Sequence, residues 1–213
     1  VSWNDKKVEK NIFQNMLGNH LTFVQLKKNN LIANGARVVL AGGEGARGIK
    51  GMIDAPHFSS AKEFNDYVYL RKTPKYNPMN AIGISKLCGA FWTSKLSGLE
   101  AESMEVIWFS PGLTYGSIGL KTLPPLKRWF MNNIMFGILS LLGQAQSPQE
   151  GGRKFADCLE GKVGGNGGLL GAPAGKTIGK ISDQASMNTA FTNEVLINEF
   201  WRILEEVCGT YKS

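Results

Sequence analysis

The chain has 213 residues and a formal net charge of +7. Apolar residues make up 43% and charged residues 19%, which excludes a mainly disordered chain, and 26 glycines without a repeating period exclude collagen. Two histidines and three widely spaced cysteines offer neither a metal-binding cluster nor a disulfide framework, and basic residues dispersed in short pairs are not typical of a nucleic-acid-binding protein.

The first third of the chain predicts a helix followed by a strand. Apolar residues recur at helical spacing over residues 8–28, and Asn34-Gly35 predicts a turn after them. Residues 36–41 are rich in β-branched and apolar side chains, which is typical of a buried strand.

Residues 42–78 are punctuated by glycine and proline, and they predict a long loop with a short helix around residues 61–67. An apolar face then predicts a helix over residues 79–97, and residues 105–109 predict a second buried strand.

The last third of the chain predicts two further helices and a third strand. Ser147-Pro148-Gln149-Glu150 is a helix start, because serine can cap the third amide and proline suits the first helical position. A short strand is expected around residues 168–172, and Thr192 is expected to cap a final helix that ends at Gly209. The alternation of helices and strands predicts an α/β fold with a parallel sheet.

The segment Gly43–Gly48 matches the glycine spacing of a dinucleotide-binding turn. That turn needs a helix to begin at the motif, so that its first amides meet the pyrophosphate. The residues that follow are not helical in pattern, so we interpret the match as coincidental. Glu44 within it is expected at the surface or as a partner of Arg47.

Several short motifs share the order and spacing of a known family. They are Asn15-Met16-Leu17-Gly18, the strand Ala36-Arg37-Val38-Val39-Leu40-Ala41 with Gly42-Gly43, Ser85-Lys86-Leu87, Ser110-Pro111-Gly112 with Thr114, the stretch from Pro125-Leu126 through Ser147–Gly152, and Ile181 to Ala185. Together they resemble the second half of a short-chain dehydrogenase/reductase, and more narrowly the protochlorophyllide reductase and retinol dehydrogenase branch. The resemblance covers about residues 8–210.

The resemblance implies a Rossmann-like parallel sheet with flanking helices, the C-terminal part of the short-chain reductase fold. The family has seven parallel strands, the first of which carry the dinucleotide-binding turn, whereas this sequence predicts three. We therefore expect residues 1–213 to form a single reductase-like domain whose N-terminal dinucleotide-binding half is absent from this sequence. An open sheet of three strands would leave an edge that needs a cover.

The family's reaction uses a tyrosine as proton donor, a lysine four residues later, a serine that polarises the carbonyl, and an asparagine on the central helix. By the resemblance, Asn15 and Lys86 are retained. Ile82 stands at the tyrosine position, and Gly42 or Gly43 at the serine position. Isoleucine cannot transfer a proton, so no intact catalytic set is expected.

Two tyrosines remain as alternative donors. Tyr76 precedes Lys86 by more than two helical turns, and Tyr115 follows the Pro-Gly loop. The resemblance also implies that NADP, if it is bound, contacts Lys86 and the loop residues Pro111, Gly112 and Thr114. A chlorophyll-type pigment is the other ligand that the branch implies.

The segment Leu123–Leu142 is apolar with basic flanks, and it is too short for a membrane span. It predicts either a buried lid helix or an apolar surface for a membrane or a partner subunit. The branch is associated with plastid membranes, so the resemblance implies a membrane-associated location in the chloroplast.

Three functions follow as hypotheses. The first is a catalytically inactive reductase-like subunit of a larger membrane-associated, photosynthetic complex, with other protein subunits as partners. The second is an NADPH-dependent oxidoreductase with an altered proton donor. The third is a module that binds a dinucleotide or a pigment without chemistry.

Overall fold

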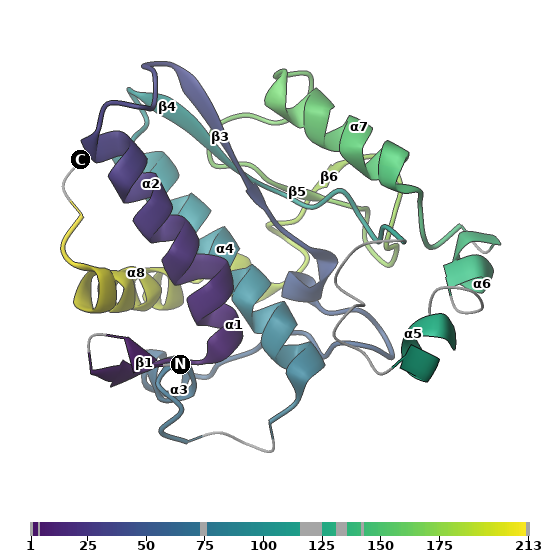
Figure 1. Ribbon diagram of the computed structural model, residues 1–213, viewed down its shortest axis with the longest axis horizontal. Helices are drawn as coiled ribbons and strands as arrows, with labels where there is room; N and C mark the ends of the chain where they lie inside the picture. The colour runs from purple at the N-terminus through teal and green to yellow at the C-terminus, as the bar shows by residue number, and fades with distance from the viewer. Residues whose placement is uncertain are drawn as a thin grey trace.

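A computed structural model describes residues 2–3, 5–72, 76–115, 125–130, 136–141 and 143–211. The described chain is an α/β structure in which helices flank a mostly parallel sheet (Figure 1). In chain order its elements are β1 (Ser2–Trp3), β2 (Lys6–Lys7), α1 (Lys10–Ile12), the π-helix η1 (Phe13–Leu17), α2 (Gly18–Lys28), β3 (Ala36–Ala41), the 3-10 helix η2 (Glu44–Arg47), α3 (Ala61–Val68), α4 (Pro78–Leu99), β4 (Met104–Phe109), α5 (Pro125–Phe130), α6 (Phe136–Leu141), α7 (Pro148–Leu159), β5 (Leu169–Gly171), β6 (Ser182–Asp183), the 3-10 helix η5 (Thr189–Thr192) and α8 (Glu194–Cys208).

The main sheet has the strand order β3-β4-β5-β6. β3 and β4 run parallel, with Ala36 opposite Met104 and Ala41 opposite Phe109, and β5 continues the parallel set. β6 pairs antiparallel with β5 and adds a fourth strand that the sequence did not predict. Its two residues carry no alternating apolar pattern, so only the pairing identifies them as a strand. The parallel α/β fold, a Rossmann-like arrangement, is confirmed.

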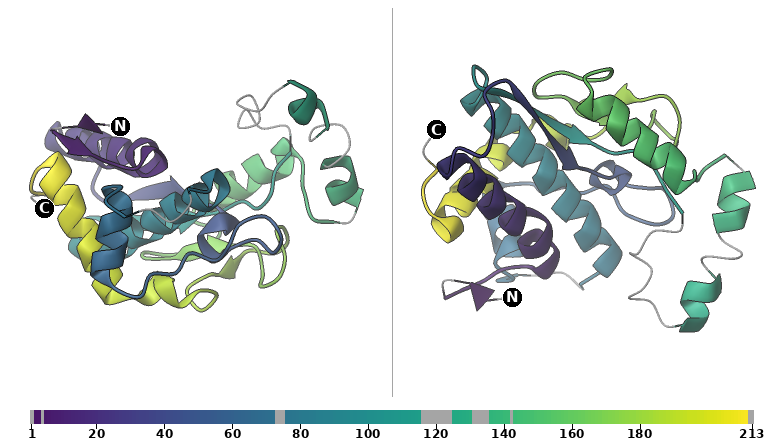
Figure 2. Two further views of the ribbon diagram at one scale, coloured as in Figure 1. Left: turned by 90° about the horizontal axis from the view of Figure 1, so that it is seen from below. Right: turned by 45° about the horizontal axis from the view of Figure 1, so that its top comes forward.

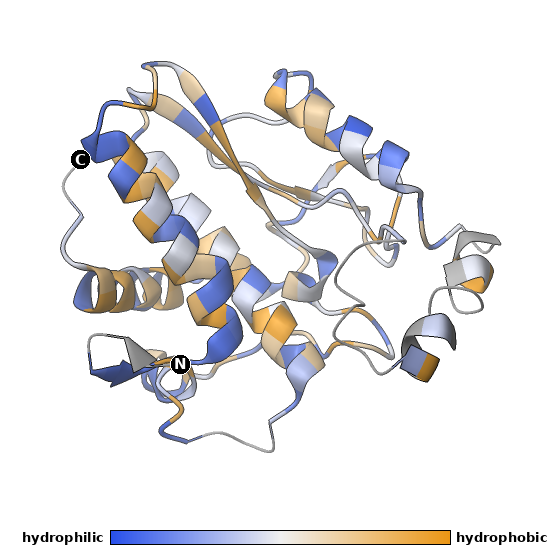
Figure 3. Ribbon diagram, viewed as in Figure 1, coloured by the Kyte–Doolittle hydropathy of each residue, from blue (hydrophilic) through white to orange (hydrophobic). Residues whose placement is uncertain are grey.

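Alternate residues of the central strands face two different layers of helices. Val106 and Trp108 of β4 pack into the larger core, which α4 and α8 cover, whereas Ile107 and Phe109 belong to a smaller core with Cys158 of α7. Figure 2 shows α7 on one face of the sheet and α2, α4 and α8 on the other. β3 and β4 are mostly apolar, and Figure 3 shows hydrophilic bands within them, where Arg37 and Glu105 form an ion pair. β4 is largely buried, whereas β3, at the sheet edge, is half-buried, so the prediction of a buried strand at residues 36–41 is wrong.

Asparagine and serine side chains start the main helices. Asn77 caps α4, where Pro78 occupies the first position, and Ser147 accepts a hydrogen bond from the Glu150 amide at the start of α7. The prediction that Thr192 caps the last helix is wrong. Thr192 ends η5, and the Asn193 side chain accepts from the amides of Val195 and Leu196 at the start of α8.

The segment after β3 is mainly loop, as predicted, but it contains the four-residue helix η2. The predicted apolar segment Leu123–Leu142 is described only in part, as the short helices α5 and α6, and the rest lies outside the described residues. These two helices lie at one end of the molecule, beyond α7 (Figures 1 and 2). In the described part of the chain, no helix has both the length and the apolar character of a membrane span.

Candidate functional site

Lys86 lies at the carboxyl end of β3, where open α/β sheets bind their ligands. It projects from α4, and its ammonium donates a hydrogen bond to the carbonyl oxygen of Ala41 over 2.9 Å. Burial of the side chain lowers the pKa of Lys86 from its ordinary value. The bond to Ala41 uses one of the three ammonium protons, so two remain for a ligand.

Asn15 reaches the same end of α4 from the neighbouring helix. Its side-chain amide donates to Ser85 Oγ over 3.0 Å, and the Ser85 hydroxyl donates to the Ile82 carbonyl oxygen. Asn15 belongs to the π-helical segment, whose wider turn is a feature often found at functional sites. Asn15 therefore contacts the residue that precedes Lys86 on α4. The Ser85 hydroxyl is already hydrogen-bonded to both Asn15 and the Ile82 carbonyl oxygen.

The two glycines at the predicted serine position have different surroundings. A Cβ on Gly43 would stand 3.4 Å from Lys86 Cγ, in ordinary contact, and Gly43 has an extended backbone. A Cβ on Gly42 would stand 2.4 Å from Trp108 Cε2, inside the buried indole. Of the two positions, Gly43 is the one that faces Lys86.

Ile82 and the two candidate tyrosines have different surroundings. Ile82 lies one helical turn before Lys86 on α4, and its side chain is 39% exposed. The hydroxyl of Tyr76 donates to Glu9 Oε1 over 2.9 Å and accepts from Asn11 Nδ2, so it is held at the start of α1. Tyr115 is fixed through its backbone amide, which donates to the Gln146 carbonyl oxygen.

Glu44 is buried, in contrast to the surface position that we expected. It is 6% exposed, and its carboxylate accepts hydrogen bonds from the Ser110 hydroxyl and from the Ala172 amide, the latter over 2.9 Å. These two residues follow β4 and β5, so one carboxylate ties together the ends of three strands. A buried carboxylate needs such donors, which replace the water that it loses. Sequence reasoning missed this contact because both partners are distant in the chain.

Two side chains, Gln146 and Lys154, hold the loop Ser110–Thr114 after β4 through hydrogen bonds. Gln146 Nε2 donates to the Pro111 carbonyl oxygen over 2.6 Å, and Lys154 Nζ donates to Gln146 Oε1 over 2.7 Å. Gly112 has a φ of +99°, and a Cβ there would stand 2.7 Å from the Thr177 carbonyl oxygen. The Thr114 hydroxyl donates back to the Gly112 carbonyl oxygen, so the loop has a set shape. Gln146 and Lys154 were not predicted as site residues.

NADP contacts at Lys86 and at the loop residues Pro111, Gly112 and Thr114 stay a prediction of the resemblance. The glycine motif Gly43–Gly48 does not fit a pyrophosphate turn, because the helix that opens there, η2, has only four residues. Within the described segments, no group of three His, Cys, Asp or Glu side chains could hold a metal ion.

No family model and no curated protein matches the chain. Among solved structures, the crystal structure of an uncharacterized protein from Mycobacterium paratuberculosis matches with a TM-score of 0.52 and 16% sequence identity. The match covers 93% of this chain and 58% of that one, so this chain spans less than two thirds of its structural neighbour. Similarity at this identity shows a shared fold only.

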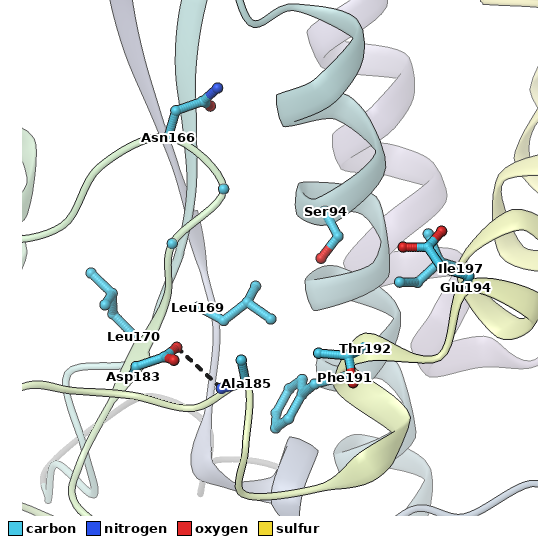
Figure 4. Close-up of a pocket in the computed structure, with 12 residues that line it drawn as sticks. Ser94, Asn166, Leu169, Leu170, Asp183, Ala185, Phe191, Thr192, Glu194 and Ile197 are labelled. Carbon is cyan, nitrogen blue, oxygen red and sulfur yellow. Dashed lines mark hydrogen bonds between the residues drawn. The ribbon is translucent and has the colours of Figure 1, made fainter.

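A pocket of about 450 Å³ lies between β5, α4 and the start of α8, and Lys86 is not among the residues that line it (Figure 4). Leu169, Phe191 and Ile197 form its apolar wall, and Asp183 and Glu194 lie at its rim. Asp183 accepts from the Ala185 amide over 3.1 Å. This pocket contains none of the predicted site residues, and its charged side chains are acidic.

Proposed function

We propose that this chain is a reductase-like protein without carbonyl-reductase activity, which serves as a structural or assembly subunit of a larger membrane-associated complex. The observation that carries the proposal is the arrangement around Lys86. Gly43 lies against the lysine and Ile82 precedes it by one helical turn, and neither residue has a group that can donate a proton. Asn15 bonds Ser85, the residue before Lys86 on α4, so the two groups that the resemblance retains lie near one end of this helix.

The outer edge of β3 supports a role in assembly. Within the described sheet β3 pairs only with β4, and a groove of about 430 Å³ lies between β3 and α2. Leu26 and Leu31 on its rim are 40% and 69% exposed. An unpaired strand beside an apolar groove is a template for another strand. Either further polypeptide of the same protein or a partner subunit would cover this edge.

The helices α5 and α6 support a second contact surface. Leu126 and Trp129 of α5 are 79% and 56% exposed, and Ile138 of α6 is 49% exposed. Such an apolar surface suits a membrane interface or another subunit. The photosynthetic and plastid setting, and a chlorophyll-type pigment as ligand, rest on the resemblance to the protochlorophyllide reductase branch.

Oxidation of NADPH by the native full-length protein tests the proposal, with protochlorophyllide and a panel of aldehydes and ketones as substrates. We expect no turnover above the background without enzyme. Turnover at an ordinary enzymatic rate, about 1 s⁻¹ or more, would overturn it. If turnover is found, Tyr115→Phe and Tyr76→Phe distinguish the donors of an altered oxidoreductase, and loss of activity in one of them would identify that donor.

Non-catalytic binding is the second candidate, because the hydrogen bond to the Ala41 carbonyl oxygen uses only one of the three protons of the Lys86 ammonium. Titration of the full-length protein with NADPH, followed by cofactor fluorescence, separates it from a purely structural role. Saturable binding that Lys86→Met abolishes, without turnover, would favour the binding module. An absorbance spectrum of the native protein tests for a bound pigment.

A further inference from the structure

A basic pocket of about 460 Å³ opens at the carboxyl end of the sheet. One wall is the segment Arg47–Lys50 after β3, and the other is the segment Ala174–Thr177 after β5, with Ser186 and Met187 nearby. Arg47, Lys50 and Lys176 give the wall three positive charges, and no Asp or Glu is among the lining residues. The volume lies in the range of small-molecule sites.

Arg47 is a fixed part of this wall. Its guanidinium donates to the carbonyl oxygens of Pro173, over 3.0 Å, and of Lys176, and it also contacts Met187 Sδ. These bonds join the two loops that form the pocket and hold the charge in place. A guanidinium stays protonated at any ordinary pH, so this charge is permanent.

Two of the three charges, those of Lys50 and Lys176, have no acidic partner among the residues that line the pocket. Lys50 and Lys176 are exposed, and neither forms an ion pair with any residue that the structure describes. Glu44 is close enough to offset part of the charge of Arg47, but it is not among the residues that line the pocket, so the lining itself carries only positive charges. Concentrated positive charge in a concave site attracts anions.

We propose that this pocket binds the phosphate group of a phosphorylated ligand. A fixed guanidinium with two mobile ammonium groups matches a doubly charged tetrahedral anion better than a single carboxylate. The Ser186 hydroxyl lies on the same wall and adds a neutral donor. A ligand held there would lie next to the ordered loop, because the Leu113 amide donates to the Thr177 carbonyl oxygen of the pocket wall. The proposal does not depend on whether the Lys86 site is catalytic.

Calorimetric titration of the full-length protein with pyrophosphate tests this assignment, because the probe carries only phosphate groups. The test variant is Lys50→Gln with Lys176→Gln, which leaves the loop contacts of Arg47 in place. The matched control is Lys10→Gln with Lys28→Gln, which removes the same charge from exposed positions elsewhere. We expect saturable binding that weakens at least about tenfold in the test variant and stays unchanged in the control, because the lost contacts are charge-assisted. Circular dichroism verifies that both variants are folded.

Two further binding experiments identify the chemical class of the ligand. Citrate in place of pyrophosphate is expected to bind more weakly. Vesicles of phosphatidylcholine with phosphatidic acid distinguish the source of the phosphate. If the protein binds these vesicles, pyrophosphate displaces it and the test variant does not bind, the ligand is a lipid headgroup. If the protein binds pyrophosphate but not the vesicles, the ligand is a soluble phosphate ester. Failure of pyrophosphate to bind, an equal loss in the control, or equal binding of citrate would overturn the proposal.

Discussion

The side chain of Lys86 lies along the backbone of Gly43, at a distance where an added Cβ would make an ordinary contact of 3.4 Å with Lys86 Cγ. The preceding residue, Gly42, has the opposite environment, because a Cβ there would overlap the Trp108 indole. Trp108 is 1% exposed and donates through Nε1 to the Lys86 carbonyl oxygen, so it cannot move without disturbing α4. Two adjacent glycines therefore tolerate substitution very differently.

The first prediction concerns this pair. Gly42→Ser should lower the free energy of unfolding by about 1–3 kcal/mol or more, because the new side chain overpacks the core. Gly43→Ser should change the free energy of unfolding by less than about 0.5 kcal/mol, because space is available and the backbone is extended. Urea denaturation measures both, and a Gly43→Ser protein as unstable as Gly42→Ser would show that the space beside Lys86 is not open.

Glu44 provides a second prediction about stability. Glu44→Ala removes the acceptor of two hydrogen bonds and leaves the Ala172 amide buried without a partner, which should lower the free energy of unfolding by about 2–3 kcal/mol. Glu44→Gln keeps one acceptor oxygen and nearly the same volume, so we expect a loss of about 1 kcal/mol.

Thermal and urea denaturation of the two Glu44 variants give the measurement. Glu105→Gln is a suitable control for the loss of one carboxylate, because Glu105 lies in β4 and is more exposed. If Glu44→Ala proved as stable as the unmodified protein, the carboxylate would not be the link between the three strand ends.

The third prediction separates Tyr76 from the site. Tyr76→Phe removes a hydroxyl that bonds the carboxylate of Glu9, which is 1% exposed, so the free energy of unfolding should fall by about 0.5–1.5 kcal/mol. NADPH binding should not change, since the hydroxyl is held at the start of α1. Parallel denaturation and NADPH titration measure the two effects, and a lost or weakened titration signal without a change in stability would place Tyr76 in the site instead.

His20 makes the folded protein sensitive to acid. It is 1% exposed, and its Nδ1 accepts a hydrogen bond from Trp92 Nε1 over 3.1 Å, which places the ring proton on Nε2. Nε2 is buried and has no hydrogen-bond partner among the described residues. Burial lowers the pKa of His20 from 6.5 to about 4.

The fourth prediction follows from the sign of this shift. Between pH 6.5 and about 4 the unfolded chain binds a proton at His20 and the folded chain does not. Stability should therefore fall as the pH decreases through this window, by up to the order of 3 kcal/mol, and it should be independent of His20 above it. Denaturation across this pH range measures the effect. His20→Phe should flatten the profile, and His57→Gln, at an exposed position, should leave it unchanged. A profile that keeps its slope in His20→Phe would assign the acid sensitivity to other groups.

Local chemistry made much of the fold predictable. The β-branched, apolar run of residues 36–41 could be recognised as a strand, although β3 lies at the sheet edge and is half-buried, not buried as predicted. Ser147-Pro148 marked the start of α7 because the capping contact spans only three residues. β6 was missed because two polar residues carry no pattern, and Asn193 was missed as a cap because Thr192 beside it has equally suitable chemistry.

By itself the sequence determined which reactive groups are present or absent. Ile82 has no proton to donate in any conformation, and this follows from its identity and its spacing from Lys86 on one helix. Only the tertiary structure decided which glycine faces that lysine, that Glu44 is buried between three strand ends, and that Arg47 and Lys176 share a pocket. These contacts join residues that follow different strands, and periodicity within one segment carries no information about which loops a parallel sheet brings together.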